Sequence, residues 1–194
     1  MSDSEPSGTD PIRPTEALLA AYVAGTLSEP FAVLVASHLQ MRADSLGDGT
    51  SIDAHRSRRP IADVGPTDAF MPLALRSYVG RHLGALEWRT ILPGLEQCWI
   101  AQDGRGDVSF LRCRPGKAIP AHTHDGREAA LVLQGGFRDH NGHYGVGDIA
   151  VADDTIDHRP VADGAVDCII FIVQEAPVRL TGPFGRLIQR IFGA

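Results

Sequence analysis

Cysteine is scarce in this chain of 194 residues, which contains three: Cys98, Cys113 and Cys168. They are widely spaced, odd in number and surrounded by apolar, strand-like sequence. This pattern excludes both a disulfide framework and a Cys-x2-Cys zinc knuckle. We expect three buried thiols in a reducing compartment.

Long hydrophobic runs and a leader-like N-terminus are also missing. No apolar run approaches the roughly 18 to 20 residues that span a bilayer. The first six residues are acidic and polar, whereas a secretory signal begins with basic residues and continues with apolar ones. The sequence therefore predicts a cytoplasmic protein without a membrane segment.

The chain lacks a basic half. Its formal net charge is −6, and residues 1–84 and 85–194 each contribute −3. Direct nucleic-acid binding is disfavoured, because neutralising phosphates requires a basic face. A basic protein partner fits this charge better. Hydrophobic residues make up 43% of the chain and charged residues 22%, as in an ordinary globular protein of one or two domains.

Residues 15–84 are predicted to be helical, after a disordered lead-in over residues 1–14. Leu18, Leu19, Tyr22 and Val23 repeat at helical spacing, and Gly25 follows in a common stop position.

A second helix begins after the N-cap residue Ser28 and runs to about Ser45. Residues 46–66 are rich in Gly, Asp, Arg and Pro and predict a flexible connection. Thr67 can cap a third helix that runs through Val79.

Residues 85–194 show a different pattern, in which short β-branched or aromatic runs alternate with turns such as Pro-Gly, Asp-Gly and Gly-Gly. This pattern is typical of an all-β sandwich or barrel. A barrel of about eight strands is wide enough to hold one small ligand or ion.

One motif in this half carries chemistry: Gly116, His122, His124, Glu128 and Gly135 are spaced G-x5-H-x-H-x3-E-x6-G. Side chains two apart on a strand point to the same face, so the two histidines should project together into the interior. Glu128 begins the apolar run that Gly135 ends, and it could reach the same ion. The pattern predicts three ligands of a metal site.

A fourth ligand must come from elsewhere in the chain, and His158 is the candidate. It follows a turn and the apolar run 149–151, and it precedes the next predicted strand. His140 and His143 lie in a turn-rich segment. We expect those two to be solvated loop residues.

The two histidine-containing segments resemble the two motifs of the cupin superfamily, the first at every fixed position and the second more loosely. The resemblance implies one divalent metal held by His122, His124, Glu128 and His158. The predicted fold class is therefore α+β: an N-terminal helical bundle followed by a C-terminal all-β cupin (jelly-roll) barrel over residues 85–194.

The combination of a helical N-terminal part and one cupin resembles the ChrR family of anti-sigma factors. The resemblance rests on residues 19–27 and 37–39 in the helical half, and on residues 131–135, 137–139 and 147–149 in the cupin half. It implies that the helical part sequesters an extracytoplasmic-function sigma factor. It further implies release under oxidative stress, by singlet oxygen or peroxide, and zinc in both parts.

One departure from the family concerns the helical part, where a His-x3-Cys-x2-Cys zinc motif is usual. Counting from His38 places Arg42 and Ser45 at the two cysteine positions. Arginine offers no lone pair to a metal, and serine is a poor zinc ligand beside thiolate. The N-terminal zinc site is therefore predicted to be absent, and His38 to be a partly buried structural histidine.

Other functions stay open at this stage. The same ligands suit iron, manganese or nickel as well as zinc, so a dioxygenase or isomerase acting on a small substrate is the main alternative. A small-molecule or peroxide sensor with another protein partner is the third. A homodimer through an exposed barrel face is also open. Cys168 is a candidate sensor thiol, although an inert buried cysteine is the simpler interpretation.

Overall fold

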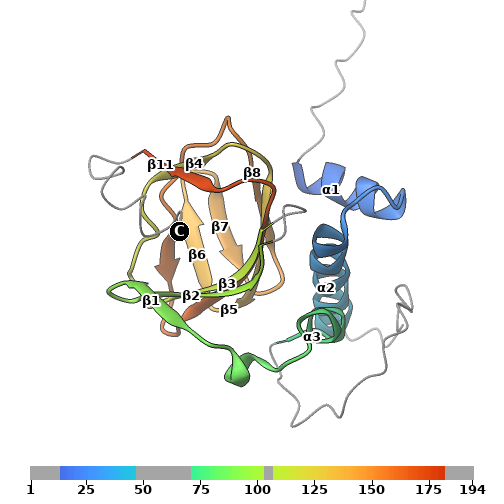
Figure 1. Ribbon diagram of the computed structural model, residues 1–194, viewed down its shortest axis with the longest axis horizontal. Coiled ribbons are helices and arrows are strands. Elements are labelled where there is room, and N and C mark those ends of the chain that lie inside the picture. The colour runs from blue at the N-terminus through green and yellow to red at the C-terminus, as the bar shows by residue number, and fades with distance from the viewer. Residues whose placement is uncertain (1–13, 47–70, 103–106, 182–194) are drawn as a thin grey trace, which may run out of the picture.

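The computed structural model describes residues 14–46, 71–102 and 107–181 (Figure 1). The helices come first: α1 (Pro14–Val23), α2 (Glu29–Leu46), α3 (Leu73–Val79) and a short 3-10 helix, η1 (Leu83–Ala85). The strands that follow are β1 (Arg89–Leu92), β2 (Leu95–Ala101), β3 (Asp107–Cys113), β4 (His122–His124), β5 (Glu128–Gln134), β6 (Gly136–Asp139), β7 (Gly142–Gly145), β8 (Ile149–Ala152), β9 (Val161–Asp163), β10 (Cys168–Gln174) and β11 (Val178–Leu180).

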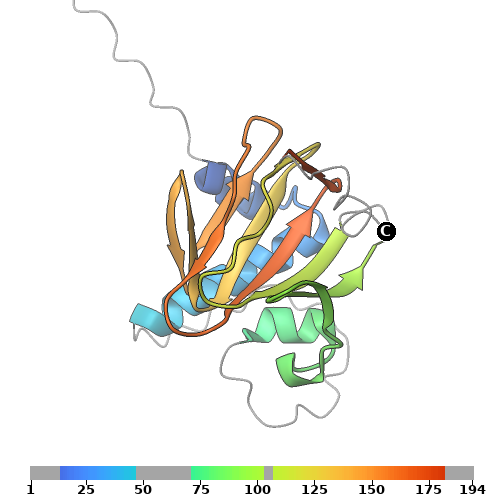
Figure 2. The same cartoon turned by 90° about the vertical axis from the view of Figure 1, so that its left-hand side faces the viewer.

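The strands form one large sheet and two small ones. The large sheet has the order β1-β2-β3-β10-β5-β8, and the small sheets are β7-β6-β9 and β11-β4. All of the strand pairs are antiparallel. The predicted β-rich, barrel-like half is thus confirmed, although its three sheets do not join into one closed ladder. Figure 2 shows the large sheet with the helices on one of its faces.

The central strand β10 explains why the sequence Cys-Ile-Ile-Phe-Ile-Val-Gln is apolar without alternation. Every residue of this strand is buried. Ile169, Phe171 and Val173 belong to the core under the helices, whereas Ile170 and Ile172 belong to the core inside the barrel. A strand that is covered on both faces requires a continuous apolar run.

The helices pack on the outer face of the large sheet and share one core with it. Phe31, Leu34 and Val35 of α2 are at most 1% exposed and lie in the same cluster as Leu131 of β5 and Phe171 of β10. Among the described residues, the helices therefore do not form the separate bundle that was expected. The physical reason is that the outward side chains of β5 and β10 are as apolar as the inward ones and need a cover.

Two polar contacts join α2 to the turn before β8. His38 is buried, and its Nδ1 donates a hydrogen bond to the Gly147 carbonyl at 2.6 Å. Arg42 pairs with Asp148 at 2.6 Å. His38 thus occupies the structural position that was predicted for it, and Arg42 contacts the β-rich half.

The first two predicted helices are present, with Gly25 at a φ of 68° after α1. Most of the predicted lead-in (1–14) and connection (46–66), together with the proposed cap Thr67, lies outside the described residues. The third helix begins at Leu73 within them. No helix in the described ranges combines the length and apolar character needed to cross a bilayer.

Candidate metal centre

Three histidines converge inside the barrel. His122 and His124 lie two apart on β4, and His158 pairs with His122 through two backbone hydrogen bonds of 3.0 Å. The three Nε2 atoms lie close together, with 3.1 Å from His158 to His122 and 3.3 Å from His158 to His124. All three residues are buried. The prediction that these histidines come together is confirmed.

The separations between the nitrogens match those expected around a metal ion. Ligands held at the zinc–nitrogen distance of about 2.0–2.1 Å in a tetrahedron are separated by about 3.3–3.4 Å. The observed separations of 3.1 and 3.3 Å lie at or just below this value. In the part of the chain that the structure describes, these histidines form a group able to hold a metal ion, with ligand atoms within 4.8 Å of one another.

The opposite ring nitrogens fix the orientation of two of these imidazoles. His122 Nδ1 donates to the Pro120 carbonyl at 2.8 Å, and His158 Nδ1 donates to Asp139 Oδ2 at 2.7 Å. A carbonyl and a carboxylate only accept hydrogen bonds, so each Nδ1 carries the proton. In the neutral ring, Nε2 then presents a lone pair. Two lone pairs facing each other at 3.1 Å repel unless a cation lies between them, so these residues fit a metal.

Burial keeps His122 and His124 neutral. The pKa of His122 falls to about 4, because of burial first and the neighbouring His158 second. The pKa of His124 falls to about 3, because of burial and then the two other histidines. Metal ligation requires neutral imidazole, so these two residues are in their ligand-competent form at neutral pH.

Glu128 lies beside this cluster. It begins β5, its side chain is 10% exposed, and its Oε2 is 3.5 Å from His124 Nδ1. Burial raises its pKa to about 7. The carboxyl group thus approaches the side of His124 that faces away from the three Nε2 atoms, and it is not part of the three-histidine group. Its role as the fourth ligand stays a prediction.

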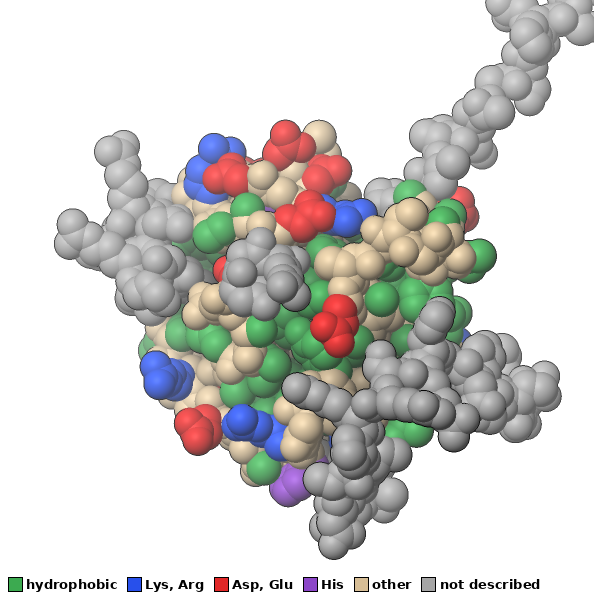
Figure 3. Space-filling view, turned by 45° about the vertical axis from the view of Figure 1, so that its right-hand side comes forward, with side chains coloured by type: hydrophobic (Ala, Val, Ile, Leu, Met, Phe, Trp, Pro, Cys, Tyr) green, Lys and Arg blue, Asp and Glu red, His purple; other side chains and the backbone are tan. Residues whose placement is uncertain are grey.

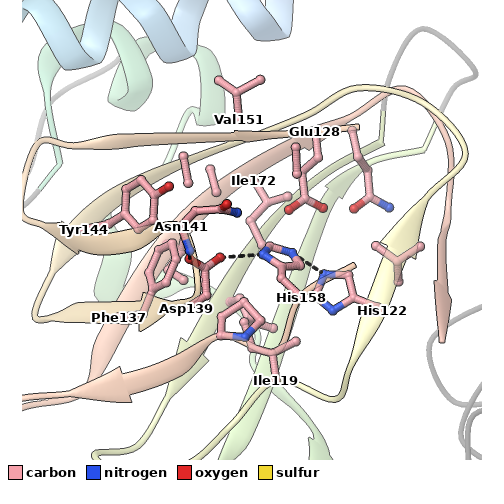
Figure 4. A pocket seen from close by; sticks show the side chains of 18 of the residues that line it. Ile119, His122, Glu128, Phe137, Asp139, Asn141, Tyr144, Val151, His158 and Ile172 are labelled. Atoms are coloured by element: carbon pink, nitrogen blue, oxygen red, sulfur yellow. Dashed lines mark hydrogen bonds and ion pairs between the residues drawn. The ribbon is translucent and has the colours of Figure 1, made fainter. Parts of the chain in front are cut away.

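An apolar cavity of about 60 Å³ opens next to the histidines (Figure 4). Its wall includes Leu111, Phe137 and Ile170, and Glu128 and His158 point into it. A buried water needs about 10–15 Å³ of such space, so there is room for roughly four to six waters or a ligand of a few heavy atoms.

Other predicted residues lie away from this centre. His140 and His143 are exposed, and His143 pairs with Asp163 at 3.2 Å, so both are solvated as expected. His140 lies in the predicted turn, whereas His143 lies on strand β7 and not in a loop. Cys168 is fully buried in the barrel core, and burial followed by the neighbouring Cys113 raises its pKa to about 12. A thiol in this state is a poor nucleophile, which favours the inert interpretation.

Asp139 belongs to the site although no sequence motif predicts it. Asp139 lies at the end of β6, and its side chain is 2% exposed against His158. The local sequence signals only a turn there, in which Asp139 Oδ1 accepts the Asn141 N–H at 2.8 Å. The contact with His158 depends on the pairing of distant strands, so local sequence has no signal for it.

The comparisons with known proteins agree with this architecture. The family described as ChrR Cupin-like domain matches residues 77–178. The anti-sigma-E factor ChrR of Cereibacter sphaeroides is 37% identical over 205 aligned positions, which cover 92% of this chain and 96% of that protein. A crystal structure of Rhodobacter sphaeroides SigE in complex with the anti-sigma ChrR matches with a TM-score of 0.61 and 36% identity, over 81% of this chain and 95% of that chain. The chain belongs to the ChrR family of anti-sigma factors.

Proposed function

We propose that this protein is a metal-binding anti-sigma factor. Its helical part (residues 15–84) sequesters an extracytoplasmic-function sigma factor in the cytoplasm, and its cupin part (residues 85–194) releases that factor under oxidative stress by singlet oxygen or peroxide. The observation that carries the proposal is the 37% identity to an anti-sigma-E factor over 92% of the chain.

The surface on the helical side suits a protein partner. Figure 3 shows many hydrophobic side chains on this face, with acidic side chains gathered along one edge. Val23 at the end of α1 is 86% exposed, and Leu73 at the start of α3 is 50% exposed. Exposed apolar side chains favour burial against a partner, and the net charge of −6 complements a basic one such as a DNA-reading sigma factor.

The metal of the cupin part is held by His122, His124, His158 and Glu128 in this proposal. Zinc is the favoured ion, with iron, manganese and nickel as alternatives. A bound divalent ion would tie β4 and β5 to the segment that carries His158, so that its loss loosens three separate stretches of chain.

A route from this centre to the helices runs through Arg127. This residue directly precedes Glu128, and its guanidinium carbon lies 4.7 Å from the ring centroid of Phe31 in α2. Its side chain also pairs with Glu175 at 2.8 Å. A shift of Glu128 therefore displaces the Arg127 guanidinium, which packs on the buried Phe31 side chain of α2.

The test of sequestration is co-purification of the full chain with each extracytoplasmic-function sigma factor of the source organism. The full chain is required because α2 shares its core with the sheet. Capture of one sigma factor, lost after peroxide or singlet oxygen exposure, is expected. Failure of the full chain to capture any of them would refute the proposed function.

The coupling is tested by measuring sigma affinity with and without zinc. Arg127→Ala should abolish the difference that the wild-type protein shows. The matched control is Arg179→Ala, since Arg179 forms an exposed ion pair with Asp125 at 3.5 Å. An undiminished zinc effect in Arg127→Ala would exclude this route.

A metal-dependent enzyme, either a dioxygenase or an isomerase, is the second candidate function. The cavity beside the histidines favours it, because a small substrate could reach the ion there. Bound iron together with oxygen consumption on a small substrate would support this alternative. Zinc content without turnover would exclude the dioxygenase.

A further inference from the structure

We propose that Asp139 is a positioning residue of the metal centre: its carboxylate holds His158 in the tautomer and orientation that direct Nε2 to the ion. This inference rests on the metal-binding part of the proposed function. It adds a residue from β6, a strand of the small sheet β7-β6-β9, which contains none of the four proposed ligands.

Asp139 lies directly against His158. Asp139 Oδ2 accepts the His158 Nδ1 proton at 2.7 Å, and the two side chains are 2% and 6% exposed. Figure 4 shows Asp139, His158 and His122 in a row, with His158 between its two neighbours. Without this acceptor, His158 could carry its proton on Nε2 instead, and that nitrogen could not bind a metal.

The carboxylate of Asp139 is itself held in place. Asp139 Oδ1 accepts the backbone N–H of Asn141 at 2.8 Å, which leaves Oδ2 directed at His158. The turn between β6 and β7 therefore fixes the acceptor, while the backbone pairing with His122 fixes the main chain of His158. Together they restrain the imidazole at both ends.

Charge also favours this role for Asp139. The histidines are neutral ligands, so negative charge nearby lowers the desolvation cost of a buried divalent ion. Glu128 supplies one negative charge, and Asp139 supplies a second through His158. With both carboxylates ionised, the bound site is neutral overall.

The experiment compares Asp139→Asn with wild type in full-length protein. Zinc affinity, measured by competition with a chromogenic chelator, should fall by roughly 10- to 100-fold, the range typical for loss of a ligand's hydrogen-bond partner. The matched control is Asp163→Asn, which breaks the exposed ion pair to His143 in the same small sheet. The control should keep wild-type affinity.

A second readout does not depend on metal. Nitrogen NMR of metal-free protein should find the His158 proton on Nδ1 in wild type. In Asp139→Leu it should be found on both nitrogens or on Nε2. An affinity of Asp139→Asn within threefold of wild type, or an Nε2–H tautomer in wild-type His158, would overturn the inference. If wild type binds no zinc, the metal part of the proposed function fails, and the tautomer measurement alone decides the role of Asp139.

Discussion

Replacing Glu128 by Gln should stabilise the metal-free protein at alkaline pH, and this advantage should disappear once zinc is bound. In metal-free protein the buried carboxyl group has its pKa raised from 4.5 to about 7. When folding raises the pKa of a carboxyl group, that group's contribution to the free energy of unfolding is fully present below its unfolded-state pKa. The contribution is lost as the pH rises through its folded-state pKa. By pH 8, ionisation of the Glu128 carboxyl group therefore lowers the free energy of unfolding by about 3 kcal/mol, at 1.36 kcal/mol per pKa unit.

Gln cannot ionise, so metal-free Glu128→Gln should be more stable than wild type by about 3 kcal/mol at pH 8 and close to it at pH 4.5. His122 and His124 act with the opposite sign, since their pKa values are lowered and their contribution is lost as pH falls below 6.5. As the pH falls from 7 to 5, each of these two histidines lowers the free energy of unfolding by about 2 kcal/mol. The Gln variant should therefore lose stability over this range more steeply than wild type.

In zinc-loaded protein this advantage should disappear. A ligand carboxylate lost to Gln weakens zinc binding, and a 100-fold loss of affinity removes about 2.7 kcal/mol of linked stabilisation, which offsets the gain of about 3 kcal/mol. The assay is denaturant unfolding at pH 8 and pH 5, with chelator or with saturating zinc. Glu96→Gln is the control, because Glu96 pairs with Arg112 on the same sheet, at 2.6 Å and away from the histidines.

Two outcomes would refute this reasoning separately. A metal-free Gln variant that is less stable than wild type at pH 8 would contradict the assignment of a buried, uncompensated charge. An unchanged zinc affinity would remove Glu128 from the ligand set and leave the three histidines, with its carboxyl group acting only on His124 Nδ1.

Three further predictions concern the helices and the thiol. Phe31→Ala should lower the free energy of unfolding by about 3–5 kcal/mol, because the side chain is 1% exposed. The helices and the sheet should still unfold in one transition, and separate early melting of the helices would contradict the shared core. Arg42→Ala should lower the free energy of unfolding by only about 0–1 kcal/mol, because the Arg42 and Asp148 side chains are 55% and 34% exposed. A loss above about 2 kcal/mol in urea unfolding would contradict this weak contribution of the ion pair. Cys168 should resist iodoacetamide at pH 8 until the protein is denatured, as mass spectrometry can check, since burial raises its thiol pKa to about 12.

The part of the site that sequence could predict is the part fixed by local periodicity. His122 and His124 share a strand face by alternation alone, and Glu128 begins the apolar run that became β5. Gly135 ends that run at a φ of 67°, where an added Cβ would lie 2.8 Å from the Asp167 carbonyl oxygen, so a glycine is required. The partner of His158 depends on tertiary pairing, and sequence alone had no means to find Asp139.

The position of the helices was less predictable for a related reason. Helical periodicity showed that α2 has an apolar face, but it could not show what covers that face. The continuous apolar run of β10 contained the missing information, because a strand that is apolar on both sides needs a cover on each.

The shared core also bears on the substituted zinc motif. With Arg42 and Ser45 at the two cysteine positions of the family motif, we expect no metal bridge to stabilise α2 at this point. Its position is instead fixed by Phe31, Leu34 and Val35 against the sheet, and by the hydrogen bond from His38 to Gly147. A helix that depends on the cupin for its place is sensitive to any change in the sheet beneath it. In this chain, packing connects the two halves, and the three histidines lie inside the barrel, on β4 and in the segment before β9.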